Sequence, residues 1–175
     1  MKKILALCLC ALFCVLPLTA CKKSDVTVPY GLQLASDPNV ADYYLFVPDD
    51  WTVDISTGVT YAYHSANDPS SISATVYKLG KDVVDADGYW DYYKAQFAGV
   101  FGDPENVETA TTLLGGKEAT QYVYTAELGN SGYKFWQVVC VNRGQVYILT
   151  YASTAENYDK HTDDMQAVVE SFLFM

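Results

Sequence analysis

The acidic residues that precede a tyrosine-rich segment are the first candidates for chemistry, because their spacing approaches that of a calcium-binding loop. Placing Gly88 at position six of such a loop puts Asp85 at three and Asp87 at five, but it also puts Val83 at one and Lys94 at twelve. Position twelve requires a bidentate glutamate, and position one requires an oxygen ligand. The sequence therefore excludes an EF-hand, and it predicts that Asp87 caps or favours the N-terminus of a following helix.

The two histidines are the next candidates for acid–base or metal chemistry. His64 and His161 are the only histidines in the chain, and each would need a carboxylate beside it in space to act as a general base or a metal ligand. Their separation along the sequence neither supports nor excludes such a partner. We expect His161 to pack beside Tyr158 and Met165 on the apolar face of a helix.

No catalytic motif accompanies these candidate residues. The chain contains no Gly-x-Ser-x-Gly, His-Glu-x-x-His, phosphate-binding loop or dinucleotide fingerprint. Asp49 with Asp50, and Asp163 with Asp164, are adjacent pairs, and neighbours on a turn or helix point in different directions. We expect these pairs to be solvated. The sequence thus predicts no catalytic residue, no cofactor and no metal site, and a protein that is not an enzyme.

One cysteine has a predicted chemical role. Lys2 and Lys3 precede the uncharged run Ile4 to Leu18, and the tetrad Leu18-Thr19-Ala20-Cys21 follows. This arrangement resembles the lipobox of a bacterial lipoprotein, and the apolar run is shorter than the roughly 18 residues of a spanning helix. We predict that residues 1–20 are a cleaved signal peptide and that lipid on Cys21 holds the chain on the extracytoplasmic face of a bacterial membrane. An ordinary secretory signal or an uncleaved anchor are the alternatives.

The other cysteines offer neither a zinc site nor a disulfide. Cys8, Cys10 and Cys14 would leave with the signal and Cys21 would carry lipid, so the exported chain would keep only Cys140. The spacing of the five cysteines matches no zinc site. Cys140 lies in a strand-like apolar run, where a thiol behaves as a small hydrophobic group.

The same cleavage defines the domain layout and the charge. Residues 21–29 would be the lipidated cysteine and a short tether, which extends at most roughly 25 to 30 Å, and residues 30–175 a single domain. Removing Lys2 and Lys3 from 11 basic residues leaves 9 against 21 acidic ones, a formal charge of −12. Such a surface repels phosphate backbones, so we expect no nucleic-acid binding. The expected partners are the membrane, through the lipid, and an envelope protein or small ligand.

The elements that position these residues follow from periodicity. Short alternating runs separated by turn residues predict strands at Tyr43–Val47, Trp51–Ile55, Val59–His64 and Ser71–Leu79. A helix follows, and then four runs joined by glycine-containing turns predict an antiparallel meander over Val107–Leu114, Lys117–Leu128, Tyr133–Asn142 and Gln145–Ala152. Ser153-Thr154-Ala155-Glu156 has capping-box spacing and predicts the start of a last helix. The predicted class is α+β: an antiparallel sheet of about seven or eight strands packed with helices.

The first predicted helix carries more aromatic residues than one face can hold. Tyr89, Trp90, Tyr92 and Tyr93 cannot all point to one side. We expect one or two of them, Trp90 first, to be exposed or to cover a loop. Core packing and sheet cover are the favoured interpretation of this segment; because tyrosine and tryptophan give large rigid contacts, a partner or ligand surface at these four residues is the alternative.

The chain as a whole resembles the PsbP-like family. The likeness rests on the run Tyr44-Leu45-Phe46-Val47-Pro48-Asp49-Asp50-Trp51, on the glycine hairpin leading to Tyr147-Ile148-Leu149-Thr150-Tyr151-Ala152, and on a helix ending Ser171-Phe172. It covers about residues 40 to 174 and implies an α/β/α sandwich. Known members include extrinsic lumenal proteins of photosystem II and exported bacterial lipoproteins, so the resemblance implies a non-enzymatic accessory or binding module. The photosystem role and its metal contacts are not carried over, because their functional residues find no match in this chain.

These observations predict a membrane-anchored extracytoplasmic lipoprotein that acts as a binding or accessory module of the cell envelope. One alternative is a small extracytoplasmic enzyme whose pocket gathers residues distant in sequence, which a deep pocket with convergent polar groups would favour. The other is a structural envelope protein, which the absence of both a pocket and an exposed aromatic cluster would favour.

Overall fold

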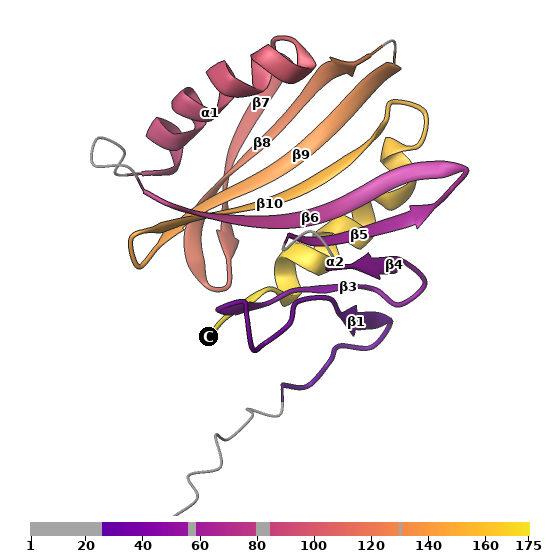
Figure 1. The fold of residues 1–175 in the computed structure, drawn as a ribbon, viewed down its shortest axis with the longest axis vertical. Helices are drawn as coiled ribbons and strands as arrows, with labels where there is room; N and C mark the ends of the chain where they lie inside the picture. The colour runs from indigo at the N-terminus through magenta and orange to yellow at the C-terminus, as the bar shows by residue number, and fades with distance from the viewer. Residues whose placement is uncertain (1–25, 56–58, 80–84, 130) are drawn as a thin grey trace, which may run out of the picture.

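A seven-stranded antiparallel sheet with the order β4-β5-β6-β10-β9-β8-β7 organises the chain (Figure 1). The computed structural model describes residues 26–55, 59–79, 85–129 and 131–175. The strands of the sheet are β4 (Thr52–Asp54), β5 (Thr60–Ser65), β6 (Asp68–Lys78), β7 (Glu105–Leu114), β8 (Lys117–Leu128), β9 (Ser131–Asn142) and β10 (Gln145–Thr154). This confirms the predicted α+β class and strand number.

Tight glycine turns set the register of the second half of the sheet. The β7–β8 turn holds Gly115 and Gly116 at positive φ, and the β9–β10 turn does the same with Arg143 and Gly144. Two successive positive-φ residues give a turn whose twist matches that of the flanking strands. The predicted four-stranded meander β7-β8-β9-β10 is therefore confirmed. Strand β6 then pairs with β10, which joins the two halves of the chain in one sheet.

Helix α1 (Ala86–Phe101) packs on β8 and β9, on one face of the sheet. Asp85 is its N-cap and accepts a hydrogen bond from the backbone N–H of Gly88 at 2.8 Å. Asp87 lies in the first turn, where a carboxylate favours the helix N-terminus, and it accepts a hydrogen bond from the Tyr122 hydroxyl at 2.7 Å. The capping role that the sequence offered to Asp87 thus belongs to Asp85.

The opposite face is covered by the C-terminal helix and the N-terminal strands. These are η1 (Tyr158–His161), α2 (Thr162–Ser171), β1 (Leu32–Leu34), β2 (Tyr43–Tyr44), β3 (Phe46–Pro48) and β11 (Leu173–Phe174). Strand β1 pairs with β3 and β2 with β11, in two small sheets. The main core lies here and buries the predicted apolar face of the last helix, including Met165, Val168, Val169 and Phe172. Among the described residues, neither helix is long and apolar enough to cross a bilayer.

The start of the last helix was predicted wrongly. Ser153 and Thr154 are the end of β10, and α2 begins at Thr162 after the single turn η1. The Ser153 side chain is fully buried, and its hydroxyl lies 2.7 Å from that of Ser70 on β6. The hydroxyl that resembled a helix cap therefore joins two strands, since a buried polar group must find a hydrogen-bond partner.

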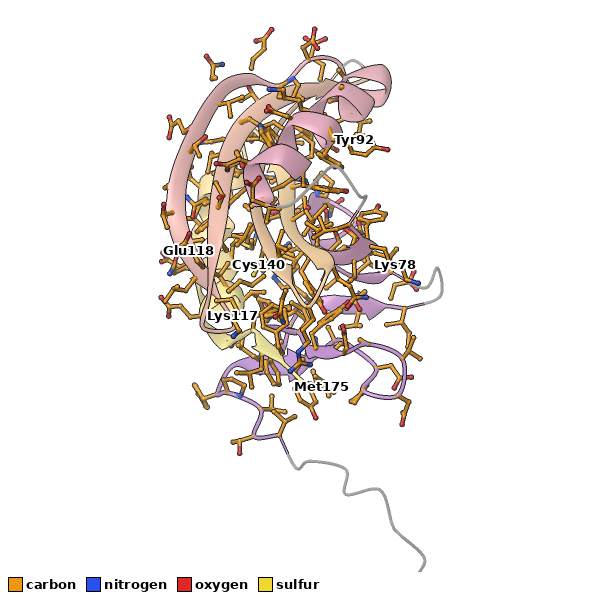
Figure 2. The ribbon with its side chains drawn as sticks, turned by 90° about the vertical axis from the view of Figure 1, so that its left-hand side faces the viewer. Lys78, Tyr92, Lys117, Glu118, Cys140 and Met175 are labelled. Carbon is orange, nitrogen blue, oxygen red and sulfur yellow. The ribbon has the colours of Figure 1, made fainter. Side chains whose placement is uncertain are left out.

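Cys140 is buried within β9, as expected (Figure 2). Its thiol lies 3.5 Å from the carbonyl oxygen of Glu118 on the neighbouring strand. Burial raises the pKa of this thiol to about 11, so it stays protonated at neutral pH. Cys21, the predicted lipidation site, lies outside the described residues.

Candidate functional site

The aromatic segment of α1 divides between the core and the surface. Tyr89 and Trp90 are buried, Tyr93 is half-buried and Tyr92 is 57% exposed. Trp90 stacks on Tyr122 of β8, with ring centroids 4.3 Å apart and planes 13° from parallel. The expectation that Trp90 is exposed is therefore wrong. Both sides of α1 carry aromatic residues, so periodicity could not choose the buried one. Tyr92 projects from α1 (Figure 2).

Beyond α1, the same face of the sheet continues across β10, β6 and β5. Residues directly opposite each other on antiparallel strands point to the same face of the sheet. The side chains on the α1 face therefore form a row from β8 to β5 through the pairs Tyr122–Gln137, Gln137–Thr150, Thr150–Ser73 and Ser73–Tyr61. A second row runs from Phe135 through Ala152 and Ser71 to Tyr63. Figure 1 shows α1 alongside β7 and β8, toward one edge of the sheet, with β4 and β5 at the other edge.

We call this surface the tyrosine face; it consists of Tyr61, Tyr63, Ser71, Ser73, Thr75, Tyr77, Tyr92 and Thr150. Tyr63 is 36% and Tyr77 48% exposed. The rings of Tyr61 and Tyr63 are 6.0 Å apart, and Tyr89 lies 6.3 Å from both Tyr77 and Tyr92. The face presents hydroxyl groups and aromatic rings, and Asp54 on β4, the register partner of Tyr61, places a carboxyl group at its edge.

A cavity of about 600 Å³ lies beside β5 and β6, lined mainly from the α2 side of the sheet and bordered by two residues of the tyrosine face. Thr75 and Tyr77 line it together with Asp42, Tyr43 and Thr60. The carboxylate of Asp42 accepts a hydrogen bond from the Tyr147 hydroxyl at 2.7 Å. The described lining combines the carboxyl groups of Asp37 and Asp42 with hydroxyl and apolar side chains, and it offers room for a small ligand.

A histidine cluster lies on the other side of the sheet, between the β5–β6 turn and α2. His161 stands between two carboxylates: its Nε2 is 3.0 Å from Asp68 Oδ2, and its Nδ1 is 2.9 Å from Asp164 Oδ2. His64 Nδ1 lies 3.7 Å from the same Asp68 oxygen. The two imidazole rings are 4.5 Å apart, and Trp51 packs edge-on against both.

Asp68 is held in place by hydrogen bonds on both oxygens. Its Oδ1 accepts from the backbone N–H of Ser70 at 3.1 Å and from the Ser70 hydroxyl at 2.6 Å, and its Oδ2 faces His161. Partial burial pushes the pKa of Asp68 upward, but the hydrogen bonds from Ser70 and His161 outweigh it and hold the pKa at about 2. The carboxyl group is therefore ionised at neutral pH.

Sequence reasoning missed this cluster. Asp68 and His161 are 93 positions apart, and their contact depends on the way α2 crosses the sheet. Two local signals were present: the four-residue spacing from His64 to Asp68 across a turn, and the three-residue spacing from His161 to Asp164 at the start of a helix. Asp164, expected to be solvated, binds His161. Chemically, the cluster can hold a proton between carboxylates or offer nitrogen and oxygen ligands to a metal ion.

The PsbP family model matches residues 35–174. Among solved structures, the chain is similar to cyanobacterial PsbP (CyanoP) from Synechocystis sp. PCC 6803, with a TM-score of 0.61, 16% identity, and coverage of 91% of this chain and 99% of that one. It is also similar to LpqN, involved in cell envelope biogenesis of Mycobacterium tuberculosis (TM-score 0.52, 20% identity, 76% of this chain and 83% of that one).

A protein of unknown function from Pseudomonas aeruginosa has the same fold, with a TM-score of 0.50, 16% identity, and coverage of 80% of this chain and 94% of that one. No curated protein matches the chain. The family match spans both cores, the sheet between them and the residues of both the tyrosine face and the histidine cluster. The chain belongs to the PsbP family.

Proposed function

We propose that this protein is a membrane-anchored, extracytoplasmic, non-enzymatic binding module of the bacterial cell envelope, and that it contacts its partner through the tyrosine face. One observation supports the proposal most directly. Helix α1 packs on β8 and β9, and on β10, β6 and β5 the same face of the sheet carries tyrosine, serine and threonine side chains. A sheet face that served only the core would instead carry aliphatic side chains, as the α2 side of β6 does with Ile72 and Ala74.

The composition of the face suits association with an uncharged partner surface. Tyrosine contributes a large rigid contact and a hydroxyl at a small cost in conformational entropy, and serine and threonine add short hydrogen-bonding groups. The exported chain is strongly acidic, and the tyrosine face carries few charged groups, with Asp54 at its β4 edge, so an envelope component meets less electrostatic repulsion there.

The predicted lipid on Cys21 supports a partner at the same membrane. The tether between Cys21 and the domain has a short reach, so a lipidated chain would stay close to the bilayer. The similarity to LpqN, which is involved in cell envelope biogenesis, agrees with an envelope role. The cavity bordered by Tyr77 has the room that a small ligand would need.

Site-specific photocrosslinking in intact cells tests this proposal. A benzophenone amino acid is placed at Tyr63 or Tyr77, and in the control at Leu113, which is 62% exposed on β7 at the far edge of the sheet. We expect a discrete crosslinked species from the two tyrosine positions, none from Leu113, and loss of the species in a Cys21→Ser background. Equal crosslinking from all three positions, or none from the tyrosine positions, would contradict the proposal.

A further inference from the structure

We propose that His64, Asp68 and His161 form a binding site for a divalent transition-metal ion, and that zinc is the ion the site suits best. This inference is independent of the tyrosine face, because the cluster lies between the β5–β6 turn and α2, on the opposite side of the sheet. It assigns a chemical role to the only two histidines of the chain.

The ligand atoms already lie close to zinc geometry. One atom from each of the three residues lies within 4.8 Å of the other two. Asp68 Oδ2 is 3.0 Å from His161 Nε2 and 3.7 Å from His64 Nδ1. Tetrahedral zinc with ligand bonds of about 2.0–2.1 Å separates its ligand atoms by about 3.3 Å. Of the three ligands, the 31% exposed His64 side chain would have to move inward to complete the arrangement.

His64 supplies an observation that a purely structural cluster does not explain. Its Nδ1 is buried and has no hydrogen-bond partner among the described residues. Its distance of 3.7 Å from Asp68 Oδ2 is too long for a hydrogen bond. A buried polar atom without a partner is destabilising and rare. A metal ion between His64 and Asp68 would satisfy this nitrogen.

The groups behind the three ligands are those that orient metal ligands in proteins. Asp164 binds the second ring nitrogen of His161, which is the carboxylate–histidine–metal arrangement, and Ser70 holds the other oxygen of Asp68. Trp51, a buried residue, packs against both imidazole rings and restricts their motion. Asp68 and His161 are thus oriented before any metal arrives, and His64 completes the site.

The donor set selects the class of ion. Two imidazoles and one carboxylate suit zinc and its neighbours, whereas calcium and magnesium prefer sites made of oxygen ligands. Three protein ligands leave one coordination position for water or for a donor atom of another molecule. An imidazole nitrogen must be deprotonated to bind a metal, so any proton on the ligand nitrogen passes to solvent. Metal affinity should therefore fall as the pH decreases.

Zinc titration of the full chain, purified in detergent without a histidine tag, tests the site. We expect one zinc ion per chain by isothermal titration calorimetry. His64→Phe keeps an aromatic ring against Trp51 but removes the ligand nitrogen, and we expect it to bind at least about 10-fold more weakly. Asp164→Asn should keep one ion per chain with about 10- to 100-fold lower affinity. Asp163→Asn, at the exposed neighbouring position, is the matched control and should bind like the wild type.

Two further measurements separate loss of metal from loss of fold. Zinc should raise the melting temperature of the wild type but not that of His64→Phe, and Co²⁺ should give the visible absorption of a tetrahedral site in the wild type alone. If His64→Phe melts well below the wild type without metal, His64→Gln takes its place in every assay. Absence of saturable zinc binding by the wild type, or undiminished binding by the folded His64 variant, would overturn the proposal.

Discussion

Replacing Trp90 by alanine tests the assignment of this residue to the core. Trp90 is 7% exposed, stacks on Tyr122 at 4.3 Å and lies 5.2 Å from Tyr124. A buried tryptophan removes roughly 150–250 Å² from water, which at about 25 cal/mol per Å² gives about 4–6 kcal/mol as an upper estimate. Partial collapse of the site reduces this value, and large-to-small aromatic substitutions cost about 3–5 kcal/mol. We therefore expect Trp90→Ala to lower the free energy of unfolding by about 3–5 kcal/mol.

The assay is urea unfolding followed by far-ultraviolet circular dichroism, with Tyr92→Ala as the matched control on the same helix. Because Tyr92 is 57% exposed, its replacement should change the free energy of unfolding by less than about 1 kcal/mol. Trp90→Phe should fall between the two, since a phenyl ring retains part of the stacking on Tyr122. Equal costs for Trp90→Ala and Tyr92→Ala would refute the placement of α1 on the sheet.

Four other perturbations have definite expected outcomes. In the presence of a chelator, ionised Asp68 should stabilise the fold by about 2 kcal/mol at neutral pH relative to Asp68→Asn. Because the pKa of Asp68 is lowered to about 2, this difference in the free energy of unfolding should be lost as the pH falls from about 4 toward 2. Urea titrations at each pH measure it. Cys140, with its raised pKa and buried thiol, should resist iodoacetamide at pH 8 in the folded chain and react in denaturant, as mass spectrometry would show. Gly115→Ala should cost about 1–3 kcal/mol in thermal unfolding, because φ is +55° and the added Cβ would lie 2.6 Å from the ring of Phe174. Cys21→Ser should abolish palmitate labelling and move the chain from the membrane to the soluble fraction; unchanged fractionation would contradict the predicted anchor.

The second half of the sheet was predictable because its determinants are local. Each turn contains a glycine that accepts positive φ, and the strands between the turns are long enough to be unambiguous. The last helix shows the limit of such reasoning. The residues from Ser153 have the spacing of a capping box, but the Ser153 hydroxyl forms a hydrogen bond with the hydroxyl of Ser70, which lies 83 positions earlier. A long-range hydrogen bond therefore overrides the local preference.

The candidate sites were less predictable than the fold, for a related reason. Tyrosines were recognised as interface residues, but the exposed ones on the sheet, Tyr63 and Tyr77, become a surface only because α1 packs on β8 and β9 and not on β5 and β6. The aromatic segment itself supplies Tyr92 to that surface and Trp90 to the core. Composition suggested aromatic residues for a surface, whereas helix placement determines which of them are exposed.

The histidine cluster extends this argument to chemistry. His64 and His161 each have an acidic residue within four positions, yet neither pair would form a site by itself. The fold makes Asp68 the shared neighbour of both histidines, while Asp164 fixes the second nitrogen of His161. Without metal, His161 Nε2 contacts Asp68 and His64 Nδ1 has no hydrogen-bond partner among the described residues; with metal, the same three groups would bind one ion. The pH at which zinc protects the fold against urea therefore reports directly on the competition between proton and metal at these residues.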